Sequence, residues 1–359
     1  MNQIPFWRSS FGEQEIVQIT NSIRNERISQ GPITEEFENQ IADLLDVPYV
    51  VVTTSGSTAL LIACIAAGIG PGDEVIIPNR TWIATAHAPL LLGAKVIFTD
   101  VKPNIPIMDT SLIQKKITSQ TKAIMPVHLN GRSVNMEIVN QIAKENDLVV
   151  IEDAAQAFLS KNKSTFLGCQ SFAGCFSLGI AKLISTGQGG FLVLRDKKVY
   201  EKIKLIRTHG VSSLFDASYS MLGSNFKFTD LLASIGIEQI KRIPKRIINY
   251  NKIYTKYSLA ISKLPFLKLI PVDIESGEIP IYIEVLCDER DKFVKFLSDN
   301  AIETKLFYPD LDTANYITCN DDFPNSRLFS KYGLMLPSGP DQLSEDIDKV
   351  IETMKKFKS

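Results

Sequence analysis

Short apolar runs alternate with amphipathic helical stretches through the first two-thirds of the chain, and this alternation constrains the fold most strongly. The runs are rich in β-branched residues and are apolar along most of their length. Such strands are buried on both faces, as in a parallel sheet covered by helices on both sides. We therefore predict an α/β fold with a largely parallel sheet. The expected strands are residues 49–54, 74–78, 94–98, 123–127 and 148–151, with helices at 57–67 and 136–145.

The pattern changes near residue 225, where a long helical stretch begins that extends to residue 243. Pro244 is expected to end or kink this helix, because proline lacks the N–H that a helix interior needs. The elements expected beyond it are helices at 247–264, 289–300 and 344–357 and strands at 267–270 and 279–286. We predict a large domain at residues 1–245 and a smaller α+β domain at residues 246–359.

Composition and charge exclude several classes of function. The formal net charge is −1, so no overall positive field would attract nucleic acid or anionic lipid. Three histidines lie far apart without zinc-type spacing, and five scattered cysteines suit reduced thiols. No segment is apolar and long enough to span a bilayer, and the N-terminus has no apolar signal core. We expect a cytoplasmic protein without a metal site.

Lys182 and Asp153 indicate the chemistry. Asp153 follows an apolar run, and Lys182 comes 29 residues later, before the glycine-rich segment 187–190. Pyridoxal phosphate (PLP) needs an amine to hold its aldehyde and an anion to keep its ring nitrogen protonated. The apolar neighbours of Lys182 are expected to lower its pKa and favour the nucleophilic amine. The alternatives are a surface lysine and an aspartate that caps a following helix.

Further segments offer contacts for a phosphate and a ring. Gly56 and Ser57 lie where a strand joins a helix, so free N–H groups would face an anion there. Trp82 follows another strand and offers an aromatic face, and Gln156 and Ser177 offer polar groups near Asp153 and Lys182. Each has a simpler interpretation: Ser57 as an ordinary helix cap, for example, and Trp82 as a core residue.

The motifs taken together resemble the DegT/DnrJ/StrS family of PLP-dependent sugar aminotransferases. The similarity extends over nearly the whole chain, from Ile28 to Pro337. It rests on the segments Ser-Gly-Ser-Thr-Ala-Leu, Thr-Trp-Ile-Ala-Thr, Val-His-Leu-Asn-Gly, Ile-Glu-Asp-Ala-Ala-Gln-Ala, Phe-Ser-x4-Lys-x3-Thr-Gly-Gln-Gly-Gly and Gly-Ser-Asn-Phe-Lys-Phe-Thr-Asp-Leu. The resemblance implies the aspartate-aminotransferase-like (type I) fold and a homodimer with active sites at the subunit interface.

The resemblance also implies a role for each matching residue. Lys182 corresponds to the Schiff-base lysine and Asp153 to the partner of the ring nitrogen. Trp82 corresponds to the ring-stacking residue and Gln156 to the O3′ contact. The residues that match phosphate ligands are Gly56, Ser57, Ser177 and Asn225, the last of which reaches the phosphate in the partner subunit's site.

The family suggests transfer of an amino group, with L-glutamate as the expected donor, to a nucleotide-linked 4-keto-6-deoxyhexose; a 3-keto sugar is the second choice. Lys182 would act as general base and acid in both half-reactions. The aminosugar would enter surface polysaccharides such as the O-antigen of lipopolysaccharide.

Four departures from the family pattern occur: Ser55, Gln188, Lys227 and the pair Ser338-Gly339. None removes a group that the cofactor needs, but the last three bear on the identity of the sugar. Phe307-Tyr308-Pro309 resembles a family segment that approaches the substrate, although a simple turn with core aromatics is an equal alternative.

Three other functions compete with an aminotransferase. A PLP-dependent sugar dehydratase of the same fold is one, although some of these enzymes replace the lysine with histidine. A non-catalytic relative would be expected to lack Lys182 or Asp153, and both are present. A nicotinamide-dependent enzyme is disfavoured because no Gly-x-Gly-x-x-Gly follows the first strand.

Overall fold

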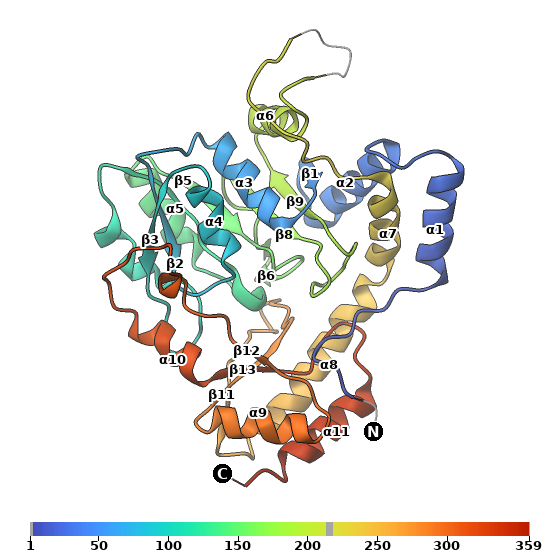
Figure 1. Cartoon of the computed structure of the whole chain (residues 1–359), viewed down its shortest axis with the longest axis vertical. Helices are drawn as coiled ribbons and strands as arrows, with labels where there is room; N and C mark the ends of the chain where they lie inside the picture. Colours follow the sequence, from blue (N-terminus) through green and yellow to red (C-terminus); the bar gives the residue numbers. More distant parts are fainter. Residues whose placement is uncertain (1–2, 213–217, 359) are drawn as a thin grey trace.

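The computed structural model describes residues 3–212 and 218–358. Within these residues, the main sheet has seven strands in the order β1-β9-β8-β5-β4-β2-β3. All neighbouring pairs from β8 to β3 are parallel, whereas β9 runs antiparallel to β1 and β8. The predicted α/β class with a mostly parallel sheet is confirmed (Figure 1). The strands are β1 (Tyr49–Thr53), β2 (Glu74–Pro78), β3 (Lys95–Thr99), β4 (Thr121–Ile124), β5 (Val149–Asp153), β8 (Ala173–Ser177) and β9 (Gly190–Leu194).

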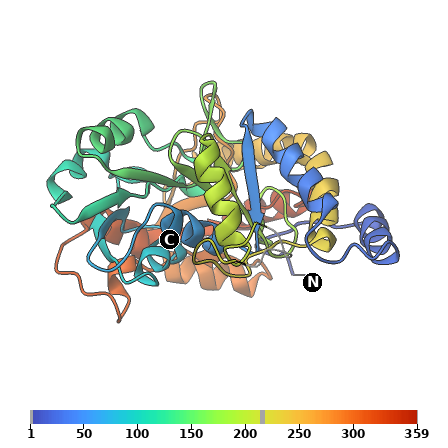
Figure 2. The same cartoon turned by 90° about the horizontal axis from the view of Figure 1, so that it is seen from above.

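Helices cover both faces of this sheet, as the continuous apolar strands require (Figure 2). In β1, Val51 packs in the same cluster as the apolar residues of α3, whereas Val50 and Val52 pack with α2 on the opposite face. Successive side chains of a strand point to opposite faces, so helices on both sides bury the strand from Val50 to Thr53. The helices of these layers are α2 (Pro32–Leu45), α3 (Gly56–Ala66), α4 (Ala84–Leu90), α5 (Met136–Glu145) and α6 (Lys197–Arg207).

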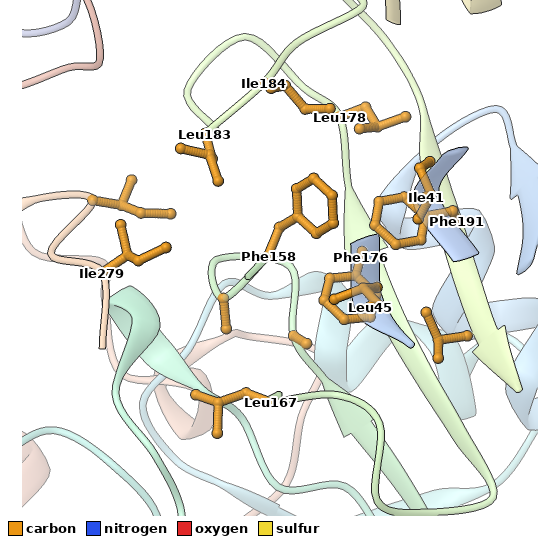
Figure 3. Close-up of a cluster of buried hydrophobic side chains, with 14 of the residues drawn as sticks. Ile41, Leu45, Phe158, Leu167, Phe176, Leu178, Leu183, Ile184, Phe191 and Ile279 are labelled. Atoms are coloured by element: carbon orange, nitrogen blue, oxygen red, sulfur yellow. The ribbon is translucent and has the colours of Figure 1, made fainter. Parts of the chain in front are cut away.

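A cluster of phenylalanine rings fills the core on the α2 side of the sheet (Figure 3). Phe176 and Phe191 stack with ring centroids 4.6 Å apart, and Phe158 meets Phe191 edge-on at 5.3 Å. Leu183 and Ile184 are buried in the same cluster. These two residues directly follow Lys182, so the core anchors the loop that carries the lysine.

The C-terminal part packs against α8 and contains an antiparallel sheet in the order β10-β11-β13-β12. Pro244 lies in the first turn of α8, where its missing N–H costs nothing, and α7 ends just before it. Helix α8 continues across residues 245 and 246, where the predicted large domain ends and the smaller domain begins. This domain boundary stays a prediction. The elements are α7 (Asp230–Lys241), α8 (Ile243–Ile261), β10 (Leu267–Leu269), β11 (Ile283–Cys287), α9 (Arg290–Asp299), β12 (Lys305–Leu306), α10 (Pro324–Tyr332), β13 (Gly333–Leu336) and α11 (Ser344–Met354).

The N-terminal segment lies across this C-terminal part. Ile4 pairs with Ile302, and Trp7 pairs with Ser338, each in a parallel bridge. Helix α1 follows and lies beside α7, at the edge of the molecule (Figure 1). Helix α1 spans Glu13–Arg24, and β6 (Lys161–Asn162) and β7 (Thr165–Phe166) form a separate hairpin.

Some predicted boundaries were wrong. The strand expected from residue 279 begins only at Ile283, because the N–H groups of Ile279 and Tyr282 donate to side chains of Ser160 and Asn130 and not to another strand. The helix expected from residue 225 begins at Asp230 with Thr229 as its cap. In the described part of the chain, no helix is long and apolar enough to cross a membrane, and no cluster of metal-binding side chains occurs.

Candidate active site

A cavity of about 370 Å³ opens where the carboxyl ends of β5 and β8 meet the start of α3. Open α/β sheets bind ligands at this edge. Seven of the eight predicted site residues line the cavity: Gly56, Ser57, Trp82, Asp153, Gln156, Ser177 and Lys182. The eighth, Asn225, does not line it within the same chain.

Asp153 ends β5 as a buried carboxylate. Its oxygens accept hydrogen bonds from the Thr85 hydroxyl at 2.7 Å and from the Ala155 N–H at 3.1 Å. Burial raises the pKa of this carboxyl, and the two hydrogen bonds offset part of that effect. Turns follow Asp153, so the alternative of an aspartate that caps a helix was wrong. A buried carboxylate with only neutral donors is suited to a cationic ligand group such as a protonated ring nitrogen.

Glu152 points to the other side of β5 and forms a buried network. Its carboxylate accepts hydrogen bonds from the N–H groups of Gly168 and Gln170, from the Ser171 hydroxyl and from Nε2 of His128. Burial alone would raise the pKa of Glu152, but these donors outweigh burial and hold it below its ordinary value. The Glu152 network thus fixes the end of β5 and with it the position of Asp153.

Lys182 lies on the loop between β8 and β9, and its side chain faces the cavity. Burial lowers the pKa of its ammonium from 10.5 to about 8, although the charge of Asp153 raises it and that of Lys305 lowers it further. The alternative of a surface lysine was therefore wrong. A larger fraction of this amine is neutral, and hence nucleophilic, near neutral pH than in an ordinary lysine.

Three distant side chains hold the backbone on either side of Lys182. The indole N–H of Trp7 donates to the Ile180 carbonyl, and the Tyr282 hydroxyl donates to the Ala181 carbonyl, each at 3.0 Å. Arg246 of α8 donates to the Leu183 carbonyl, also at 3.0 Å. The sequence analysis missed these contacts, because nothing in the local pattern links residues 7, 246 and 282 to residue 182.

The start of α3 forms the end of the cavity that suits a phosphate. The first intrahelical bond runs from the Ala59 N–H to the Ser55 carbonyl, so the N–H groups of Gly56 and Ser57 precede it. The cap is Ser55, whose hydroxyl accepts from the Thr58 N–H; Ser57 is not the cap. A Cβ at position 56 would lie 2.8 Å from Cβ of Ser177, so only glycine allows this close approach.

Gln156 and Tyr308 form the polar side of the cavity. The Gln156 carbonyl oxygen accepts the Asn130 N–H at 2.9 Å, which orients the amide toward the Tyr308 hydroxyl. The Trp82 ring is 53% exposed and lies edge-on to Tyr308, so the alternative of a core tryptophan was wrong. Phe307 and Tyr308 both belong to the buried core cluster, and Tyr308 also lines the cavity.

The positions that depart from the family pattern are spread over the molecule. Ser55 and Gln188 line the cavity. Lys227 and the exposed Asn225 do not line it, and Lys227 lies beside a second cavity that includes Ser29 and Gln30. Ser338 is buried and donates to the Ile281 carbonyl. A role of Asn225 in the site of a partner subunit stays a prediction.

Comparison with known proteins shows the family. A model of the DegT/DnrJ/EryC1/StrS aminotransferase family matches residues 9–355, and the chain belongs to this family. It is thus a PLP-dependent sugar aminotransferase, as the sequence analysis predicted, with PLP as the expected cofactor. GDP-perosamine synthase of Escherichia coli O157:H7 is 32% identical to it over 100% of both chains.

Two solved structures have the same fold. DesV of S. venezuelae, in complex with a ketimine intermediate, superposes with a TM-score of 0.92 at 25% identity, covering 99% of this chain and 98% of DesV. The GDP-4-keto-6-deoxy-D-mannose-3-dehydratase of E. coli, with bound hydrated PLP, superposes with a TM-score of 0.90 at 24% identity, covering 99% of this chain and 100% of the dehydratase. The type I fold that the resemblance implied is confirmed.

The residues of the cavity fit PLP. Asp153 is suited to the ring nitrogen, the start of α3 with Ser177 to the phosphate, and Lys182 to the aldehyde. The glycine at position 56 lets the start of α3 pack closely against Ser177, so both lie at the same end of the cavity.

Proposed function

We propose that this enzyme transfers the amino group of L-glutamate to a nucleotide-linked 4-keto-6-deoxyhexose. The observation that carries the proposal is the joint placement of Lys182, with a pKa of about 8, and the buried Asp153 in one cavity. GDP-perosamine synthase, the relative at 32% identity, supports a GDP-linked aminosugar as the product.

Asp153, Glu152 and Lys182 have different roles in the proposed reaction. PLP, when bound, withdraws electrons from the carbon that loses its proton. Asp153 stabilises the protonated ring nitrogen, and the Glu152 network keeps Asp153 at the end of β5. Lys182 would accept the proton from the α-carbon of the donor and deliver it to C4′ of the cofactor, because a substantial fraction of its amine is neutral near neutral pH.

We also propose that the active enzyme is a homodimer in which Asn225 contributes to the site of the partner subunit. Asn225 is exposed and outside the cavity of its own chain, which supports this assignment. The cross-subunit role predicts that mixed dimers of Asn225→Ala and Lys182→Ala subunits recover part of the activity that each homodimer lacks. No recovery in verified mixed dimers would contradict it.

The substrate is tested by incubating the PLP-loaded protein with L-glutamate and a panel of GDP-, dTDP- and UDP-linked ketosugars. We expect mass spectrometry to show an aminated sugar and 2-oxoglutarate in equal amounts. The Lys182→Ala variant is the control and should form neither product while it keeps its fold. Loss of a hydroxyl from the sugar without incorporation of nitrogen would instead identify a dehydratase.

A further inference from the structure

Lys305 places an ammonium group at the cavity, and the proposed reaction assigns no role to this group. It begins β12 and lines the cavity together with Lys182 and Asp153. The side chain is half-buried, and burial lowers its pKa. The sequence analysis did not single it out, although it lies three residues before Tyr308.

Aromatic rings surround this ammonium. Its Nζ lies 4.9 Å from the ring centroid of Tyr308, 5.9 Å from that of Trp82 and 6.0 Å from that of Phe6. Ring faces attract a cation but give it no hydrogen-bond acceptor. The rings therefore hold the group at the cavity and leave its three N–H donors available to a ligand.

Two other carboxylates of this region already have cationic partners. Asp310 pairs with Arg80, and Glu284 pairs with Arg132. Glu284 of β11 and Lys305 of β12 both pair with Met335 of β13, one on each side. Strand β13 therefore separates Glu284 from Lys305. Among residues 3–212 and 218–358, no carboxylate lies within ion-pair distance of Lys305. A half-buried cation without an anion is costly, unless a ligand supplies the anion.

We propose that Lys305 binds an oxyanion of the substrate at the mouth of the cofactor cavity. This inference rests on the proposed function, because that function supplies the anions. Two sources have the required chemistry: a carboxylate of the amino-acid donor in the first half-reaction, and the diphosphate of the nucleotide sugar in the second. The phosphate of PLP is not a source, because the start of α3 accommodates it.

The test compares Lys305→Met and Lys305→Arg in the PLP-loaded enzyme. Methionine keeps the apolar stem without the charge, whereas arginine keeps the charge. Lys331→Met is the matched control, because Nζ of Lys331 lies 4.8 Å from the Tyr332 ring on the surface, away from the cavity. Two ligands serve as probes in titrations of the visible spectrum: glutarate for the donor carboxylates, and GDP for the nucleotide diphosphate.

We expect Lys305→Met to weaken one of the two probes by roughly 10- to 100-fold, as for loss of a charge-assisted hydrogen bond. Lys305→Arg should retain affinity within a few-fold, and Lys331→Met should change nothing. Weakened glutarate would assign the site to the donor, and weakened GDP to the nucleotide sugar. The affinity for PLP should be the same in all variants.

Two results would overturn the inference: unchanged affinity for both probes in Lys305→Met, or equal losses in the methionine and arginine variants. If Lys305→Met does not fold, Lys305→Gln replaces it under the same criteria. Failure of the proposed function would give a different result from failure of the Lys305 inference. In that case no ketosugar is aminated by the wild type, whereas the charge dependence of probe binding persists.

Discussion

Covalent capture of PLP by the apoprotein should depend on pH as the amine of Lys182 titrates. With a pKa of about 8, roughly one molecule in eleven carries the neutral amine at pH 7. An ordinary lysine with a pKa of 10.5 would be neutral in only about 0.03% of molecules at that pH. The structure therefore predicts a roughly 300-fold larger reactive fraction at pH 7 than in an exposed lysine.

The assay mixes apoprotein with PLP at pH values from about 6.5 to 10 and traps the product with borohydride at short times. Mass spectrometry then quantifies the modification at Lys182 separately from other lysines. The rate constant should rise with pH, because only the neutral amine attacks, and should be half-maximal near pH 8. It should be flat by about pH 9.5.

The variant Asp153→Asn tests whether the charge of Asp153 raises the pKa of Lys182. The negative charge of Asp153 stabilises the Lys182 ammonium, so its removal should move the midpoint below 8. A midpoint near 10.5 in the wild type would show that burial does not tune this amine. An upward movement in Asp153→Asn would show that the charge coupling between the two residues has the wrong sign.

Three further predictions concern residues that support the site. Tyr282→Phe removes the donor to the Ala181 carbonyl, so it should lower the free energy of urea unfolding by about 1 kcal/mol. The variant should also lower kcat several-fold more than it changes KM. An unchanged kcat would argue against a role of Tyr282 in positioning the Lys182 loop. Glu152→Gln should cost about 3 kcal/mol at pH 7. The folded pKa of Glu152 lies below 4.5, so its contribution to the free energy of unfolding is present above pH 4.5 and is lost as the pH falls through the folded pKa. The free energies of urea unfolding of the variant and the wild type should therefore converge at low pH. A difference between them that stays constant with pH would refute this assignment. Gly174→Ala places a Cβ 1.7 Å from the Gly168 carbonyl oxygen and should lower Tm by more than about 10 °C, whereas Gly70→Ala, with open space around it, should have little effect; equal Tm values would contradict the close packing of β8.

The local pattern of the sequence was enough for the α/β class and for seven of the residues that line the cavity. Apolar β-branched runs predicted β2 at its observed bounds, and the periodicity of residues 136–145 did the same for α5. Asp153 and Lys182 were predicted because each follows or adjoins a recognisable element, and they line one cavity. The strand expected from residue 279 was wrong at its start because side chains from elsewhere replaced strand pairing, as Asn130 does for the N–H of Tyr282.

The order of residues alone thus indicated the candidate groups for the chemistry, because strand ends and glycine-rich turns are local features. Only the tertiary structure decided how those groups are tuned and held. The pKa of Lys182 depends on burial and on charges at residues 153 and 305, and its loop depends on donors from residues 7, 246 and 282. Desolvation and hydrogen bonds between distant segments arise only when the chain is folded, so no local pattern contains them.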